Sequence, residues 1–155
     1  MKSGDNTFSV EQPEESSGFL LWRVTNLWQR EIRKALVPHG ITHSQFVLMA
    51  SAHWLALQGK EVTQVLLSDH TDIDPMTTST VLRTLQQKGL VVRKEHATDT
   101  RAKTVALTEK GKEVIKKAVV TVETFDTRFF TVPRLNTGDF NKMLLSLLGR
   151  NETKP

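Results

Sequence analysis

The sequence of 155 residues contains no cysteine. Disulfide bonds, thiol-based redox sensing and cysteine-ligated zinc are therefore excluded. No apolar run approaches the roughly 18 residues of a membrane helix, and the polar, acidic first 18 residues do not resemble a signal peptide. The length suits one domain with its own core. We therefore expect a single-domain cytoplasmic protein.

The sequence also lacks the motifs of the common enzyme and metal sites. It has no phosphate-binding glycine loop, no nucleophile elbow and no paired acids near a histidine, so neither catalysis nor a cofactor is expected. His39 and His43 are four residues apart, but Pro38 and Gly40 prevent them from sharing a helix face. On one helix, His43 and His53 would be about 80° out of alignment. No metal site is predicted.

Charge is distributed unevenly along the chain. Residues 1–17 hold one lysine and four acidic residues, and we interpret them as a flexible polar arm. The rest of the chain has 20 basic and 13 acidic residues, a net charge of +7. Such a body favours a polyanionic partner, although many ordinary solvated domains share this balance.

Hydrophobic spacing predicts two helices in the first 60 residues. The first covers residues 18–37, and its apolar stripe is broad enough to be contacted from two sides. The second runs from about Thr42 to Gln58, because Thr42 and Gln45 form a capping box. We expect this second helix to turn Phe46, Met49 and Leu57 inward.

Two further helices are expected before residue 90. Thr63 is placed to cap a short helix, and Asp74 followed by Pro75 is typical of the start of the next one. One face of this helix is apolar. The other has no acid and is small and polar near its start, as expected for a surface that approaches an anion: Met76, Thr77, Thr80, Arg83, Thr84 and Gln87.

A hairpin and two more helices complete the pattern. Strands are predicted at Leu90–Lys94 and Thr104–Leu107, joined by a charged loop without Gly or Pro. A long helix follows from Thr108 to about Phe130, and a last helix spans about Thr137–Leu148 and is expected to bury its apolar residues. The long helix carries a 3-4 seam that needs a partner: Ile115, Ala118, Val122, Phe125 and Phe129.

This order predicts a mainly α fold, a winged helix–turn–helix with a two-stranded β wing. The residues that form this pattern resemble the MarR (multiple antibiotic resistance regulator) family of transcription factors. The similarity covers residues 18–148 and is most specific in "KGLVVRKEHATDTRAKTVALTEKG", which is similar to the family's wing signature of Asp-x-Arg followed by Leu-Thr-x-x-Gly.

The resemblance implies one MarR-like domain over residues 18–150. Residues 41–108 would form the DNA-binding lobe, and residues 18–37 and 109–150 the N- and C-terminal dimerisation helices of a homodimer. It also implies a repressor that releases its operator when a small phenolic or other aromatic effector binds. The absence of cysteine excludes the peroxide-sensing branch of the family.

Eight residues are our candidates for contact with double-stranded DNA. Arg83 suits bidentate reading of guanine, although a phosphate contact is nearly as plausible, and the threonine hydroxyls and free N–H groups early in the helix suit phosphates. Arg101 would reach the minor groove or the backbone, with Asp99 holding the loop's shape. The full set is Thr77, Thr80, Arg83, Thr84, Arg93, Asp99, Arg101 and Lys103.

An effector site is the least specific prediction. His39, His43 and Trp54 fall in the region that borders the effector pocket in the family, where an aromatic ligand could stack. Core and dimer packing explains most tryptophans equally well. Two alternatives remain: a DNA-binding protein without an effector, and a metal- or ligand-binding protein on the same fold.

Overall fold

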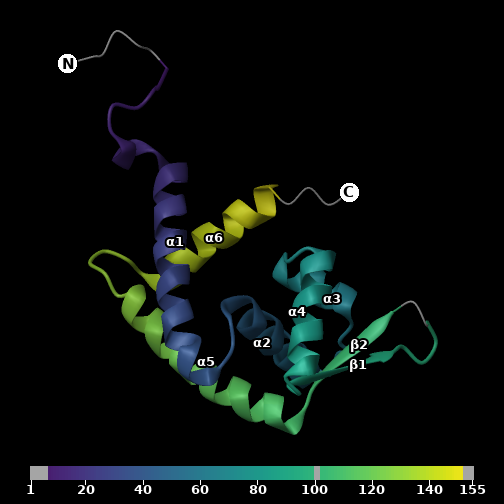
Figure 1. The fold of residues 1–155 in the computed structure, drawn as a ribbon. Helices are drawn as coiled ribbons and strands as arrows, with labels where there is room; N and C mark the ends of the chain where they lie inside the picture. Colours follow the sequence, from purple (N-terminus) through teal and green to yellow (C-terminus); the bar gives the residue numbers. More distant parts are fainter. Residues whose placement is uncertain (1–6, 100–101, 152–155) are drawn as a thin grey trace. The chain divides into compact units, whose positions relative to one another are not determined.

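The computed structural model describes residues 7–99 and 102–151. The predicted order of six helices and a hairpin is confirmed (Figure 1). Two short 3-10 turns, Pro13–Glu15 and Val37–His39, flank the first helix. The elements are α1 (Ser17–Leu36), α2 (His43–Leu57), α3 (Gln64–Thr71), α4 (Pro75–Gln87), β1 (Val91–Glu95), β2 (Lys103–Leu107), α5 (Glu109–Phe129) and α6 (Thr137–Asn151).

The chain divides into two compact units, the first ending at Val122 and the second beginning at Glu123. The first unit contains α1 to α4, the hairpin and most of α5. The second contains the end of α5 and α6, where Phe129, Phe130 and Phe140 form a chain of ring contacts. No helix in the described part of the chain is long and apolar enough to cross a bilayer.

Helix starts follow the capping residues read from the sequence. Thr42 accepts a hydrogen bond from the Gln45 N–H at 3.3 Å, and the Gln45 side chain accepts one from the Thr42 N–H at 3.0 Å. This reciprocal pair is the predicted capping box. Thr63 likewise caps α3 through the Leu66 N–H at 3.1 Å.

The turn between α3 and α4 is held by buried hydroxyl groups. Asp72 ends α3 in the left-handed region, with φ of 56°. The carbonyl of Ile73 then accepts hydrogen bonds from the hydroxyls of Ser68 at 2.6 Å and Thr78 at 3.2 Å. Both side chains are buried, so this carbonyl is satisfied without water and the angle between the two helices is fixed.

The junction between the hairpin and α5 explains why glycine stands at position 111. Thr108 donates its hydroxyl to the Gly89 carbonyl at 2.7 Å and accepts the Gly111 N–H at 3.0 Å. A Cβ atom added to Gly111 would lie 2.0 Å from the Leu90 carbonyl oxygen. The first turn of α5 can therefore approach β1 this closely only with glycine here.

The core of the first unit lies among α2, α3, α4 and the hairpin. Its fully buried side chains include Leu48, Met49, Leu55, Leu67, Leu82 and Leu85. The prediction that Leu57 turns inward is wrong: its side chain is 70% exposed, since it lies in the last turn of α2. Leu55, two residues earlier, points inward instead.

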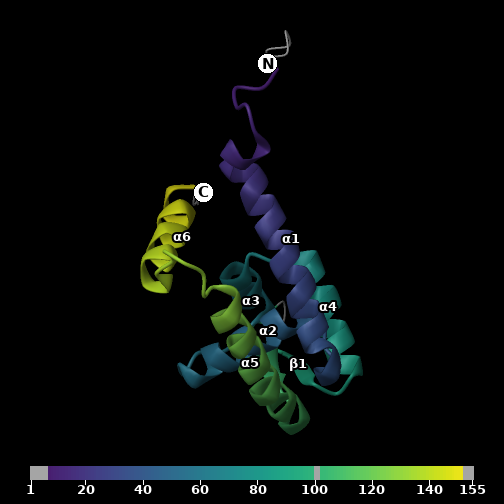
Figure 2. The same ribbon diagram turned by 90° about the vertical axis from the view of Figure 1, so that its left-hand side faces the viewer.

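The first and last helices bury little within one chain. In α1 only Ile32 and Leu36, both near its C-terminal end, are buried, and Figures 1 and 2 show its N-terminal half standing clear of α2 to α4. The prediction that α6 buries its apolar residues is wrong for the single chain. Met143, Leu147 and Leu148 are each at least half exposed among the residues that the structure describes.

Candidate nucleic-acid interface

Helix α4 has one face in the core and one face in solvent. Thr78, Leu82 and Leu85 are buried, which fixes the rotation of the helix. The opposite face exposes Met76, Thr77, Thr80, Arg83 and Gln87, and no acidic residue lies between Pro75 and Gln87. The sequence prediction of these two faces is confirmed. An exposed, acid-free face on the second helix of a helix–turn–helix is suited to the major groove.

The start of α4 is occupied by its own cap. The Thr77 N–H donates to the Asp74 carboxylate at 2.9 Å. Hydrogen bonds from the Thr77 side chain and N–H hold the pKa of the Asp74 carboxyl below its usual value. The Thr77 N–H is therefore not among the N–H groups left for phosphate early in α4, because the carboxylate already uses it and neutralises part of the positive helix end.

The other two threonines of the face bond back to their own helix. The Thr80 hydroxyl donates to the Met76 carbonyl at 3.0 Å, and the Thr84 hydroxyl donates to the Thr80 carbonyl at 3.3 Å. A phosphate contact would require each hydroxyl to rotate away from that carbonyl. The oxygens remain available as acceptors, so in this rotamer they suit donor groups on base edges.

The two arginines of this surface are held very differently. Arg93, on β1, donates to Gln86 of α4 and to Gln64 of α3, both at 2.9 Å. Its guanidinium is thereby fixed at the base of the wing, with three N–H groups left for another acceptor. Within the described residues, no hydrogen bond or ion pair engages Arg83. Arg83 is therefore the exposed guanidinium that is free to read a base.

The wing is a regular antiparallel hairpin up to its loop. Lys94 faces Thr104 and Glu95 faces Lys103 in the register, and Lys94 and Lys103 are both exposed. Asp99 is exposed, and its carbonyl accepts the Ala102 N–H at 3.0 Å. Arg101 lies outside the described residues, so its predicted contact with DNA stays a prediction.

Sequence reasoning missed three residues that orient this surface. Gln64 and Gln86 position Arg93, and His96 contacts both Glu61 and the backbone of the wing loop. Neither glutamine stands in a recognisable motif, and their contacts join residues 7 and 29 positions apart. His96 lies in the charged loop without Gly or Pro between the two predicted strands.

The three candidate effector residues do not form one site. The His39 ring nitrogen Nε2 lies 2.8 Å from the Thr121 hydroxyl of α5, and Trp28 of α1 packs edge-on against His43 at 5.1 Å between ring centroids. Trp54 stacks on His70 of α3 instead. It stands eleven positions after His43 on α2, about 16 Å along the helix axis. His39 and His43 thus remain candidates near one end of α2, and Trp54 lies toward the other.

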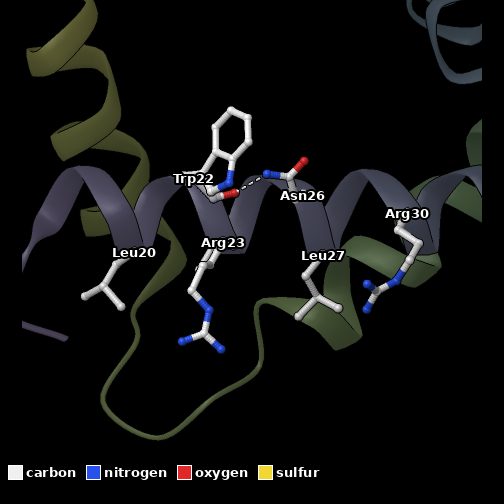
Figure 3. Close-up of a pocket in the computed structure, with 7 residues that line it drawn as sticks. Leu20, Trp22, Arg23, Asn26, Leu27 and Arg30 are labelled. Carbon is white, nitrogen blue, oxygen red and sulfur yellow. Dashed lines mark hydrogen bonds between the residues drawn. The ribbon is translucent and has the colours of Figure 1, made fainter. Parts of the chain in front are cut away.

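A groove of about 650 Å³ runs along the exposed part of α1. Figure 3 shows Leu20, Arg23, Leu27 and Arg30 projecting from the same side of the helix, so apolar and guanidinium groups alternate. Asn26 points elsewhere and donates to the Trp22 carbonyl at 2.8 Å. The described residues include no cluster of three or more histidine or acidic groups that could hold a metal ion.

Comparison with known proteins finds a matching family model and similar transcriptional regulators. The family model "ArnR1-like, winged-helix domain" matches residues 38–125. The uncharacterized HTH-type transcriptional regulator YdcH of Bacillus subtilis is 41% identical over 118 residues, which are 76% of this chain and 80% of YdcH. The HTH-type transcriptional repressor Rv2887 of Mycobacterium tuberculosis is 30% identical over 84% of this chain and 91% of its own.

Solved structures agree with this assignment. CouR from Rhodococcus jostii RHA1 bound to p-coumaroyl-CoA superposes with a TM-score of 0.76 and 26% identity, over 94% of this chain and 99% of CouR. A mutant of MarR from E. coli complexed with operator DNA gives 0.71 and 25%, over 86% and 91%. The MarR family protein Rv2887 in complex with p-aminosalicylic acid gives 0.61 and 29%, over 85% and 98%.

Proposed function

This chain belongs to the MarR family of winged helix–turn–helix transcriptional regulators, DNA-binding proteins and not enzymes, and we propose that it represses transcription by covering an operator as a homodimer. The observation that carries the proposal is the exposed, acid-free face of α4 with Arg83 unengaged. A relative of 30% identity is named a transcriptional repressor, and a similar structure holds operator DNA. A regulator of chromosomal DNA works in the bacterial cytoplasm.

The proposed contacts divide into base reading and backbone positioning. Arg83, with the hydroxyl oxygens of Thr80 and Thr84, faces the base edges of the major groove. Arg93 and Lys103 lie along phosphates, Arg101 extends the wing toward the minor groove, Asp99 shapes the wing loop, and Thr77 holds the helix start. Arg93 supports this role because two glutamines preset its guanidinium before DNA arrives.

Dimerisation rests on the terminal helices. Residues 18–37 and 109–150 carry apolar side chains that the single chain leaves exposed, among them Leu21 at 59%, Trp22 at 68% and Leu147 at 58%. The prediction that the α5 seam needs a partner is wrong for Ile115, Ala118 and Val122, which are buried within the chain. Exposed apolar surface of this extent is typical of an interface with another subunit. Two lobes related by a two-fold axis would then bind a pseudo-palindrome with half-sites about one helical turn apart.

Release of the operator is proposed to follow binding of a small aromatic acid. CouR was solved with p-coumaroyl-CoA and Rv2887 with p-aminosalicylic acid, both aromatic compounds with an anionic group. The α1 groove lies on the helix assigned to the dimer, so an aromatic acid there would be held between the two subunits, with Leu20 and Leu27 against its ring and Arg23 and Arg30 paired with its carboxylate. His39 and His43 are retained as further candidates near α2.

The proposal is tested by fluorescence anisotropy with selected genomic duplexes across a range of salt concentrations. We expect sequence-selective binding of two protomers per site and a steep loss of affinity with salt, because phosphate contacts release counterions. Binding no tighter than to random duplex at every salt concentration would contradict the function. Aromatic acids are then added to the complex. If none releases the operator while DNA binding holds, the chain is a regulator without this effector class.

A further inference from the structure

One side chain connects the wing loop to the body of the first unit. His96 follows β1, and its Nε2 atom lies 2.9 Å from Oε2 of Glu61 in the loop before α3. Its Nδ1 atom accepts the backbone N–H groups of Thr98 at 3.2 Å and Asp99 at 3.3 Å, and lies 3.1 Å from the Thr98 hydroxyl. The ring thus holds residues 97–99 on one side and Glu61 on the other.

These contacts give each ring nitrogen a different role. A backbone N–H can only donate, so the Nδ1 atom that faces two of them carries no hydrogen. The single ring hydrogen is then on Nε2 and is donated to the Glu61 carboxylate. In this arrangement both ring nitrogens are used. An added proton could sit only on Nδ1, where it would face the two N–H groups.

We propose that neutral His96 is a positioning residue for DNA binding, which orders the wing loop and releases it on protonation. The inference rests on the proposed function, because residues 97–99 lead directly into the part of the loop that carries Arg101. Loss of the Nδ1 acceptor frees the N–H groups of Thr98 and Asp99. DNA binding must then order this segment anew, and affinity falls.

The other charged groups around His96 do not oppose this effect strongly. Glu61 would form an ion pair with the protonated ring, but its side chain is 63% exposed, so the gain is small. Lys60 adjoins Glu61 in the same loop, Glu95 pairs across the hairpin with Lys103, and Asp99 lies three residues along. Acid also protonates groups that all the variants share, and that general gain in positive charge favours DNA equally in each, so it cancels in the comparison with His96→Asn.

Two substitutions separate the roles of the two ring nitrogens. In His96→Asn the side-chain oxygen takes the place of Nδ1 as an acceptor and cannot be protonated in this range. In His96→Gln the longer amide can still reach Glu61 but no longer the loop N–H groups. His53→Asn, in the same lobe and outside the proposed contacts, is the matched control for removing a histidine.

The experiment measures operator affinity for these four proteins between about pH 8 and pH 5.5, the range in which imidazoles titrate. At pH 8 we expect the Asn variant to bind like the wild type and the Gln variant to bind about five-fold more weakly, as for one lost hydrogen bond. As pH falls, the wild type should lose about five-fold relative to His96→Asn, and His53→Asn should follow the wild type. A wild-type affinity that stays parallel to that of His96→Asn at every pH would overturn the proposal.

Amide hydrogen exchange of the free protein tests the same contacts without DNA. The amides of Thr98 and Asp99 should exchange more slowly in the wild type and in His96→Asn than in His96→Gln at pH 8. Equal exchange in all three would overturn the role of His96 even if the operator is bound. Protection that follows this order in a protein that binds no duplex would instead leave the loop contacts standing and contradict the proposed function.

Discussion

The DNA-binding lobe and the terminal helices of this chain both contain many leucines, but they differ in whether a single chain buries these side chains. In the lobe, Leu48, Leu67 and Leu82 are fully buried within one copy of the chain, and its turns are closed by hydroxyl–carbonyl bonds. Apart from Leu36 at the end of α1, the leucines of α1 and α6 are exposed, for example Leu21 at 59% and Leu145 at 65%. The lobe is complete by itself, whereas the terminal helices lack a partner.

The difference shows where stability and assembly each reside. Hydrophobic burial stabilises only surface that leaves water, at about 25 cal/mol per Å². The lobe obtains this gain on folding, and the terminal helices would obtain it on association. Substitutions in the lobe core should therefore affect folding at any protein concentration, and substitutions on the exposed faces of α1 and α6 should affect an equilibrium that depends on concentration.

The largest effect is expected from Gly111→Ala, which places a methyl group in the junction between the hairpin and α5. The new Cβ would lie 2.0 Å from the Leu90 carbonyl oxygen, and a backbone atom cannot move aside as a flexible side chain can. We expect a loss of roughly 3 kcal/mol in the free energy of unfolding, measured by thermal or urea denaturation.

The matched control is Gly18→Ala in α1, where no atom lies within 4 Å of the added Cβ. Alanine favours a helix over glycine, so this variant should be as stable as the wild type or slightly more stable. Equal stability of the two variants would mean that the junction between the hairpin and α5 is not as tightly packed as described.

The second prediction separates assembly from folding. Leu21→Glu places a charge on the exposed apolar face of α1, and we expect a dimer weakened by roughly 2–3 kcal/mol because the carboxylate loses water on association. Sedimentation velocity at several concentrations measures the change. The lobe should keep its circular dichroism and its cooperative melting.

Leu57→Glu is the comparison, because Leu57 is equally apolar and 70% exposed but belongs to the lobe. It should leave the dimer intact. If Leu57→Glu dissociates the dimer and Leu21→Glu does not, the interface has been assigned to the wrong surface.

Within the lobe, Arg83→Ala distinguishes a base contact from a phosphate contact. A bidentate contact to guanine contributes about 1–3 kcal/mol of discrimination, so the variant should lose affinity for the operator and tolerate changes at one base pair. The measurement is anisotropy against an operator and its single-base variants. Gln87→Ala, one turn along the same exposed face, should change little. A uniform loss across all duplexes, with a lower salt slope, would assign Arg83 to phosphate instead.

Much of the lobe could be predicted from sequence because its signals are local. Thr42 with Gln45, Thr63, and Asp74 with Pro75 each mark a helix start within four residues, and all three starts are where the spacing placed them. Amphipathic spacing also identified the two faces of α4. Capping and periodicity depend on neighbours in the chain, so one sequence is sufficient to read them.

The features that the sequence could not show depend on contacts between residues that are distant in the chain, or on which elements cover an apolar face. The link from Arg93 to Gln64 crosses 29 positions, and the link from His96 to Glu61 crosses 35. The hydrogen bond from the Thr77 N–H to Asp74 is local and follows from Asp74 being the N-cap, although the N–H groups early in this helix were expected to suit phosphates. Periodicity places Leu57 and the α6 leucines on apolar faces, but it does not specify whether another element covers those faces.

The smallest effect concerns the cap that holds α4 in place. The pKa of the Asp74 carboxyl is lowered in the folded protein, chiefly by the Thr77 side chain. A lowered pKa means that the ionised carboxylate stabilises the fold above its ordinary pKa near 3.8, and that this contribution disappears as pH falls through the lower folded value. Asparagine caps helices as well as aspartate does but does not titrate. Asp74→Asn should therefore melt slightly below the wild type at pH 7 and level with it near pH 3, since by then the wild-type carboxyl is losing its charge. Because both proteins share every other carboxylate, the difference between their melting temperatures isolates this one cap. A difference that is the same at both pH values would show that the charge of Asp74 adds nothing to the hydrogen bonds of the cap.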